Sequence, residues 1–90
     1  MEPLTIAERL QMVKTASGHG GDYTDDLLQI YIDEAIDVLV DGGVKQDVAL
    51  SKAAIGSIVI FVNDNWNYDA GGVVYSDAFR KRLIQLAAKE

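Results

Sequence analysis

The chain has no cysteine and a single histidine, and these two shortages exclude several kinds of chemistry. Without cysteine, neither a disulfide framework nor a thiolate metal site can form. The histidine, His19, lies between glycines in a loop, where we expect it to be solvated rather than catalytic or metal-binding. The glycines around it lack the Lys-Ser/Thr pair of a phosphate-binding loop. The sequence therefore predicts a protein that is not an enzyme and that holds no cofactor or metal.

Proline and basic residues are also scarce. One proline and few serines leave no linker, and 90 residues make a single domain spanning 1–90. Eight basic against fourteen acidic residues give a net charge of −6, which disfavours binding to a phosphate backbone. The N-terminus has no basic region followed by an apolar stretch, so we expect no signal peptide and synthesis in the cytoplasm. No apolar run approaches the ~20 residues that cross a bilayer, so no membrane partner is expected.

The most apolar stretch spans 53–66 and ends on the only tryptophan, Trp66. It is apolar nearly all round, which predicts a central element contacted on several sides. Ser51 is a suitable N-cap and good helix formers follow it, which favours one helix over about 51–65. The β-branched residues 58–60 also permit a buried strand, and periodicity alone does not separate the two. Length and context favour the helix.

A capping box predicts the first helix. Thr5 is the N-cap, and Glu8 is placed three residues on, where its side chain can reach back to the Thr5 backbone N–H. The helix continues to about residue 16, and the glycine-rich segment 17–22 ends it. Its expected buried stripe consists of Ile6, Leu10 and Val13, with Met12 as a further candidate.

Two more helices complete the predicted fold. Apolar residues three and four apart predict an amphipathic helix over 25–41, which Gly42 and Gly43 end. Ser76 caps a last helix, from 77 to about 88. The fold class is therefore all-α: a small four-helix domain with short loops, in which 44–50 is a connection.

Three segments resemble functional motifs without matching them. Segment 64–72 has oxygen ligands at alternate positions, as in a calcium loop, but alanine stands where that loop needs glycine and serine where it needs glutamate. Neither Ser51 nor Ser76 lies in the Asp-Ser-Leu context of an acyl carrier protein. Residues 80–82 form the only dense basic cluster, but adjacent helix residues point ~100° apart and so do not make one DNA-binding face.

The central helix has more apolar surface than one core-facing stripe needs. Val59 and Ile60 lie off that stripe, and Trp66 and Tyr68 mark its aromatic end. Trp and Tyr suit interfaces because each combines a large apolar body with a polar tip. The helix is either well covered within its own domain or in contact with another subunit, and the sequence leaves both interpretations open.

The second half of the chain carries a family resemblance. The central helix opens with AAIGSI and closes on NWNY, and a turn-rich loop and a Ser-capped helix, YSDAFRKRLIQL, follow. In this pattern the chain resembles the head–tail connector family of long-tailed double-stranded DNA phages. Members of that family often carry an acidic amphipathic helix like the one predicted over 25–39. The chain departs from the family in lacking the proline often found just before the central helix.

The resemblance implies a virion structural protein. Such a subunit assembles as a ring, twelvefold in the virion, below the portal protein and joins it to tail and stopper proteins. DNA passes through the ring without sequence-specific binding. The implied location is the head–tail junction, after assembly in the bacterial host cytoplasm. A heterologous ring requires two complementary faces on each subunit, and the acidic helix over 25–41 and the basic segment 80–82 are the candidate pair.

Particular residues are candidates for these contacts. The candidate subunit interface consists of Asp33, Asp37, Val59, Ile60, Trp66, Tyr68, Arg80 and Arg82. Exposed glycine-rich loops can order on binding, and the candidate portal- or tail-contacting loop consists of Asp69, Gly71, Gly72 and Tyr75. A second hypothesis, from a different class of function, is a small acidic helical protein-binding module, such as a regulator or antitoxin-like inhibitor. It would act through the apolar and aromatic surface.

Overall fold

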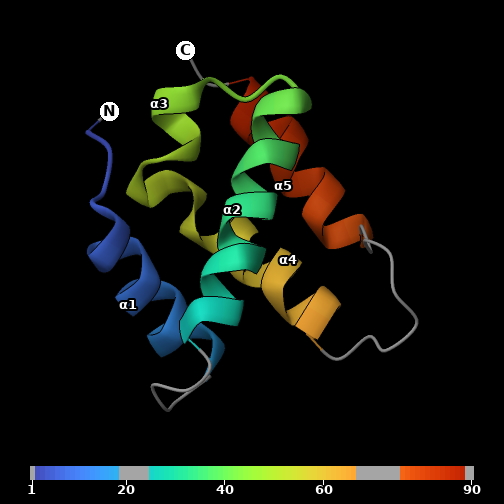
Figure 1. Cartoon of the computed structure of the whole chain (residues 1–90). Helices are drawn as coiled ribbons and strands as arrows, with labels where there is room; N and C mark the ends of the chain where they lie inside the picture. Colours follow the sequence, from blue (N-terminus) through green and yellow to red (C-terminus); the bar gives the residue numbers. More distant parts are fainter. Residues whose placement is uncertain (1, 19–24, 67–75, 89–90) are drawn as a thin grey trace.

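The computed structural model describes residues 2–18, 25–66 and 76–88, and these are mainly helical (Figure 1). The α-helices are α1 (Ile6–Ser17), α2 (Asp25–Asp41), α3 (Gln46–Ala49), α4 (Ile55–Trp66) and α5 (Asp77–Ala87), and a 3₁₀ helix, η2 (Lys52–Ala54), leads into α4. Within these three ranges no strand forms. Pro3 and Ser51 make an isolated antiparallel β-bridge. The predicted all-α fold is confirmed.

Three of the helices begin at the caps predicted from the sequence. Thr5 Oγ1 accepts a hydrogen bond from the Glu8 backbone N–H (3.1 Å), and Glu8 Oε1 accepts one from the Thr5 backbone N–H (2.9 Å). The Thr5 backbone N–H donates to the Glu8 carboxylate, and the Thr5 hydroxyl makes a second, smaller contribution. Both favour the charged form, so the pKa of Glu8 lies below its ordinary value. Ser51 and Ser76 each accept a backbone N–H at 3.2 Å, at the starts of η2 and α5.

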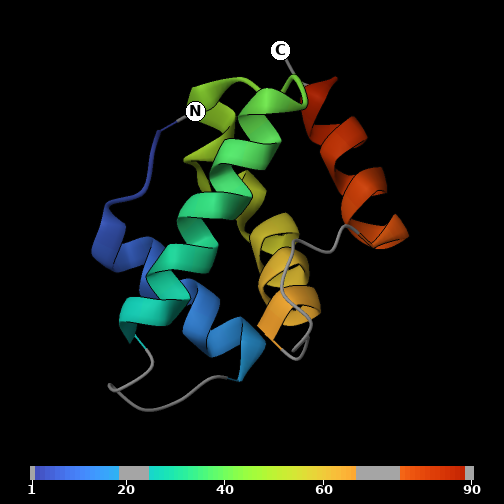
Figure 2. The same cartoon turned by 45° about the vertical axis from the view of Figure 1, so that its right-hand side comes forward.

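The central position predicted for the apolar helix is confirmed. α4 packs against α1, α2 and α5, and α1 and α5 lie on opposite sides of the α2–α4 pair (Figure 2). Its inward side chains include the fully buried Ile58, Phe61 and Val62. Gly56 and Asn63 lie on the opposite, exposed side. The alternative of a buried strand over 58–60 is wrong, because contact on three sides accounts for the apolar run.

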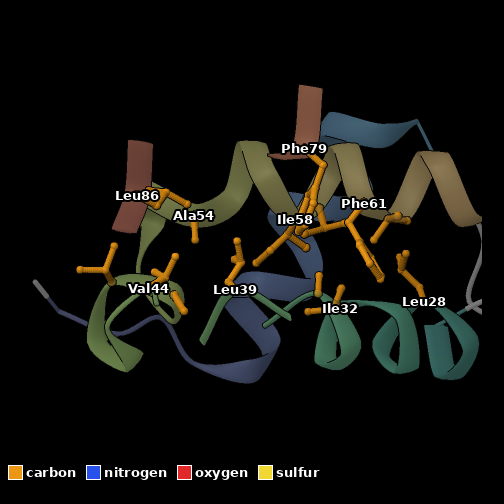
Figure 3. Packing of buried hydrophobic residues seen from close by; sticks show 14 residues of the cluster. Leu28, Ile32, Leu39, Val44, Ala54, Ile58, Phe61, Phe79 and Leu86 are labelled. Carbon is orange, nitrogen blue, oxygen red and sulfur yellow. The ribbon is translucent and has the colours of Figure 1, made fainter. Parts of the chain in front are cut away.

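The main core lies where α2 meets α4. Ile32 and Leu39 of α2 point toward the layer that holds Ile58 and Phe61 of α4 (Figure 3). α5 adds Phe79, whose ring centroid lies 5.3 Å from that of Phe61 with the planes tilted by 53°. Tilted aromatic pairs at this distance are favourable, and each fully buried side chain of this size contributes about 1.5–3 kcal/mol. The α2–α4–α5 contact therefore supplies much of the stability of the chain.

α1 is rotated relative to the stripe expected from the sequence. Ile6, expected to be buried, is 67% exposed, so that prediction is wrong. Arg9 faces inward instead and is 4% exposed, one turn before the fully buried Val13. Leu10 is half-buried and packs against the edge of the core. The buried stripe therefore includes a charged residue.

The inward position of Arg9 is explained by two backbone carbonyls. Arg9 Nη2 donates to the carbonyl oxygens of Leu4 (3.0 Å) and Leu50 (3.1 Å), and the Leu4 backbone N–H donates to the same Leu50 oxygen (2.8 Å). These two acceptors offset part of the cost of burying the charge, while the buried Arg9 Nε has no hydrogen-bond partner among the described residues. Arg9 thereby joins the N-terminal segment to the residues that precede α4.

Segment 44–50 is more ordered than the plain connection expected. Gly43, at φ 104°, makes the turn out of α2, in a conformation that favours glycine. Residues 46–49 then form α3, with Val48 and Ala49 buried and Leu50 half-buried. Val48 and Ala49 belong to the buried core, and the expectation of a connection without a helix between α2 and α4 is wrong.

Candidate interaction surfaces

The outward side of α2 is strongly acidic. Exposed residues recur there every three or four positions, opposite the stripe that packs on α4. The helix contains no basic residue. We call this surface the acidic face; it consists of Asp26, Ile30, Asp33, Glu34, Asp37 and Asp41.

The acidic face is unfavourable for the helix that carries it. Asp37 lies four residues from both Asp33 and Asp41, and like charges at this spacing destabilise a helix by about 0.2–0.5 kcal/mol per pair. Asp41 is also the last residue of α2, where the helix dipole favours cations. In the described part of the chain, none of these three carboxylates is ion-paired. The isolated chain therefore loses stability to this arrangement, as expected of a surface that meets cations elsewhere.

Accessible apolar side chains lie on α2 rather than on α4. Leu27 is 47% exposed and Ile30 is 58% exposed. Val59 and Ile60, the candidate interface residues of α4, are half-buried and pack against the core. The apolar surplus of α4 is thus largely used within the domain. The exposed apolar residues of α2, which also include Val40, were not predicted as a surface because they lie among helix-forming and acidic neighbours.

The basic residues of α5 are all exposed but lie on different sides of the helix. Arg80 and Arg82 leave it about 160° apart, as residues two positions apart do. Leu83, on the Arg80 edge, packs against Gly42 at the end of α2, where an added Cβ would lie 2.7 Å from Leu83 Cδ1. Arg82 lies on the edge that faces α4, with Nη1 3.9 Å from the position of a Cβ added at Gly56. The structure therefore separates Arg80 from Arg82, which were predicted to share one interface.

Arg82 borders a pocket of about 430 Å³ between α5 and the start of α4. Its lining, which we call the Arg82 pocket, consists of Ala53, Ser57, Arg82, Gln85, Leu86 and Ala88. A guanidinium, an amide and a hydroxyl thus share the pocket with apolar side chains. This combination suits a ligand that presents a carboxylate together with an apolar group.

A second hollow, of about 390 Å³, lies between α1 and the start of α4. It is mainly apolar and is lined by Gln11, Met12, Thr15, Ala16, Lys52 and Ile55. Among the described lining residues, Lys52 is the one that carries a charge.

Metal-binding and membrane-spanning features are not found in the ranges that the structure describes. No group of three or more His, Asp or Glu side chains is placed there to hold a metal ion. No helix there has both the length and the hydropathy that crossing a bilayer requires. Outside the described residues lie His19, the side chain of Trp66, Tyr68, and the loop residues Asp69, Gly71, Gly72 and Tyr75.

Comparisons of the chain with protein-family models, with curated proteins and with solved structures find no match. The features that bear on function are therefore those of the chain itself. They are the acidic face on α2, the exposed basic residues of α5 and the Arg82 pocket.

Proposed function

We propose that this chain is a virion structural protein, a head–tail connector subunit that assembles as a ring below the portal of a long-tailed phage. The resemblance of its second half to that family supports the proposal. One structural observation carries it further: a single subunit presents an acidic face on α2 and exposed cations on another helix, α5. Head-to-tail contacts between two different surfaces build rings when the rotation between subunits closes.

The charge of the chain is compatible with a DNA conduit. A net charge of −6 makes a wall that repels phosphates, so DNA would pass through without adhering. In this function the portal protein and the tail or stopper proteins are the partners at the two ends of the ring. The subunit acts by assembling and not by catalysis, at the head–tail junction.

Self-association is the test of this function. We would measure mass by light scattering after size exclusion, from low micromolar to near-millimolar protein, with electron micrographs of the most concentrated sample. We expect closed rings, since heterologous contacts extend until they close, and the family resemblance implies about a dozen copies in each. Raising the salt concentration should dissociate them, because screening weakens charge pairing at the exposed surface. A chain that stays monomeric at every concentration would contradict self-assembly.

A second candidate function is a small acidic module that binds another protein. The exposed Leu27 and Ile30 favour it, because apolar side chains among carboxylates suit a basic amphipathic helix. In that case the chain would remain monomeric and would bind a designed basic amphipathic peptide one to one. Ile30→Ser should then weaken peptide binding, whereas a chain that forms rings and ignores the peptide would contradict this function.

A further inference from the structure

We propose that the Arg82 pocket receives the acidic face of a second copy of this chain. The inference rests on the self-assembly proposed above and names the contact that carries it. Both halves of the contact are exposed in the single chain, one on α2 and the other between α5 and α4. The pocket and the acidic face are complementary in charge, and both also carry apolar groups. This complementarity identifies a second copy of the chain as the occupant of the pocket.

The polar side of the match is a guanidinium meeting carboxylates. Arg82 is exposed and forms no ion pair within residues 2–18, 25–66 and 76–88. Gly56 beside it has no side chain to fill the space next to Nη1. An arginine fork binds a carboxylate through two parallel hydrogen bonds, and Gln85 and Ser57 supply further donors in the same pocket. The pocket is thus equipped for an aspartate side chain.

The apolar side of the match is an isoleucine meeting small and aliphatic side chains. Ile30 is 58% exposed and lies three residues before Asp33 and seven before Asp37, so the three share one side of α2. The Arg82 pocket provides Ala53, Leu86 and Ala88 beside its polar groups. Burying one isoleucine against these apolar side chains contributes favourable free energy in addition to that of the charge pairing.

The contact must form between copies. The opposite stripe of α2 packs on α4, so the acidic face points away from α4, whereas residues of α5 and the start of α4 line the Arg82 pocket. One chain cannot place its own acidic face in its own pocket. Each copy therefore offers a free pocket and a free acidic face, which is the requirement for a head-to-tail ring.

A matched pair of charge reversals tests the pocket. Arg82→Glu and Arg80→Glu change the net charge equally and alter exposed residues of the same helix, but only Arg82 lines the pocket. We expect Arg82→Glu to weaken association by about tenfold or more, and Arg80→Glu to assemble like the wild type. Circular dichroism and urea unfolding of both variants should show an unchanged fold.

Charge exchange tests the occupant. Asp33→Lys/Asp37→Lys should also fail to associate, because two cations would then face Arg82. An equimolar mixture of this variant with Arg82→Glu should assemble in strict one-to-one alternation, since each contact between unlike chains pairs opposite charges. A single chain carrying all three substitutions should assemble by itself. Recovery of this kind is not expected from an effect on net charge alone.

The outcomes separate the two proposals. If the wild type forms rings and Arg82→Glu forms them equally well, or if the mixture fails to recover, the pocket contact is overturned while the connector function stands. If the wild type is monomeric throughout, a second copy does not occupy the pocket and the self-assembly proposal falls with it. Rings that need Arg82, tolerate Arg80→Glu and return on charge exchange would establish the contact.

Discussion

Leu83 of α5 packs directly on Gly42 at the end of α2. A Cβ added at Gly42 would lie 2.7 and 2.8 Å from the two methyl carbons of Leu83, which is closer than carbon atoms normally approach. Gly42 is not among the described glycines with positive φ, so its backbone conformation does not require glycine. Glycine is needed there because a side chain would collide with Leu83. This contact holds the C-terminal end of α2 against α5.

Gly42→Ala should therefore destabilise the chain, by about 1 kcal/mol, because Leu83 must move to admit the methyl group. Leu83 is half-buried, which keeps the cost at the low end for overpacking. Urea unfolding of Gly42→Ala, Leu83→Ala and the double variant would measure it, and we expect the two effects to be non-additive by about 0.5 kcal/mol or more. Additive effects, or stabilisation by Gly42→Ala, would contradict this contact.

Arg9→Ala should cost about 3 kcal/mol, because it removes hydrogen bonds from a charged donor to the carbonyls of Leu4 and Leu50. Amide exchange at Leu4 should accelerate as the N-terminal segment detaches. The matched control is Lys14→Ala in the same helix, which breaks a partly buried ion pair with Asp25 (2.9 Å) and should cost less than Arg9→Ala, because the Asp25 side chain is about one third exposed. Equal costs for the two variants would show that Arg9 contributes no more than the Lys14–Asp25 pair.

Glu8→Gln should change the pH dependence of stability. The folded pKa of Glu8 is lowered, so the stability that its carboxylate contributes is present above the unfolded pKa and is lost as pH falls through the folded pKa. The difference in free energy of unfolding between wild type and Glu8→Gln should thus exist at neutral pH and vanish in acid. Thr5→Ala, which removes the cap itself, should cost about 1 kcal/mol. A Glu8→Gln difference that stays constant across the pH series would contradict the assignment.

Asp37→Lys should stabilise the isolated chain while weakening its assembly. It removes two like-charge pairs within α2 and places a cation in the C-terminal half of the helix, for a gain of about 0.5–1 kcal/mol. Unfolding at low protein concentration would measure the gain, and light scattering would measure the loss of association. Glu2→Lys, the same charge change at an exposed residue away from the acidic face, should assemble normally. A loss of association in both variants would assign the effect to net charge.

Local structure was predictable from the sequence because it depends on residues a few positions apart. The capping box of Thr5 and Glu8 and the serine caps at 51 and 76 act within three residues of themselves. The glycines after α1 and α2 end those helices for the same reason. The all-round apolar character of α4 predicted its central position, since one stripe would suffice for a helix at the surface. The charges of the two candidate surfaces were likewise visible in the sequence.

The sequence by itself thus determined the all-α fold, the starts and ends of the main helices, and which helix carries acid and which carries base. The tertiary structure alone decided which way each helix is turned. Arg9 faces inward and Ile6 outward because a carbonyl 41 residues away accepts from the guanidinium. Arg82 borders a pocket that Arg80 does not reach because α5 packs with Leu83 against Gly42. Helix rotation depends on contacts between distant segments, and residue spacing within one helix does not contain them.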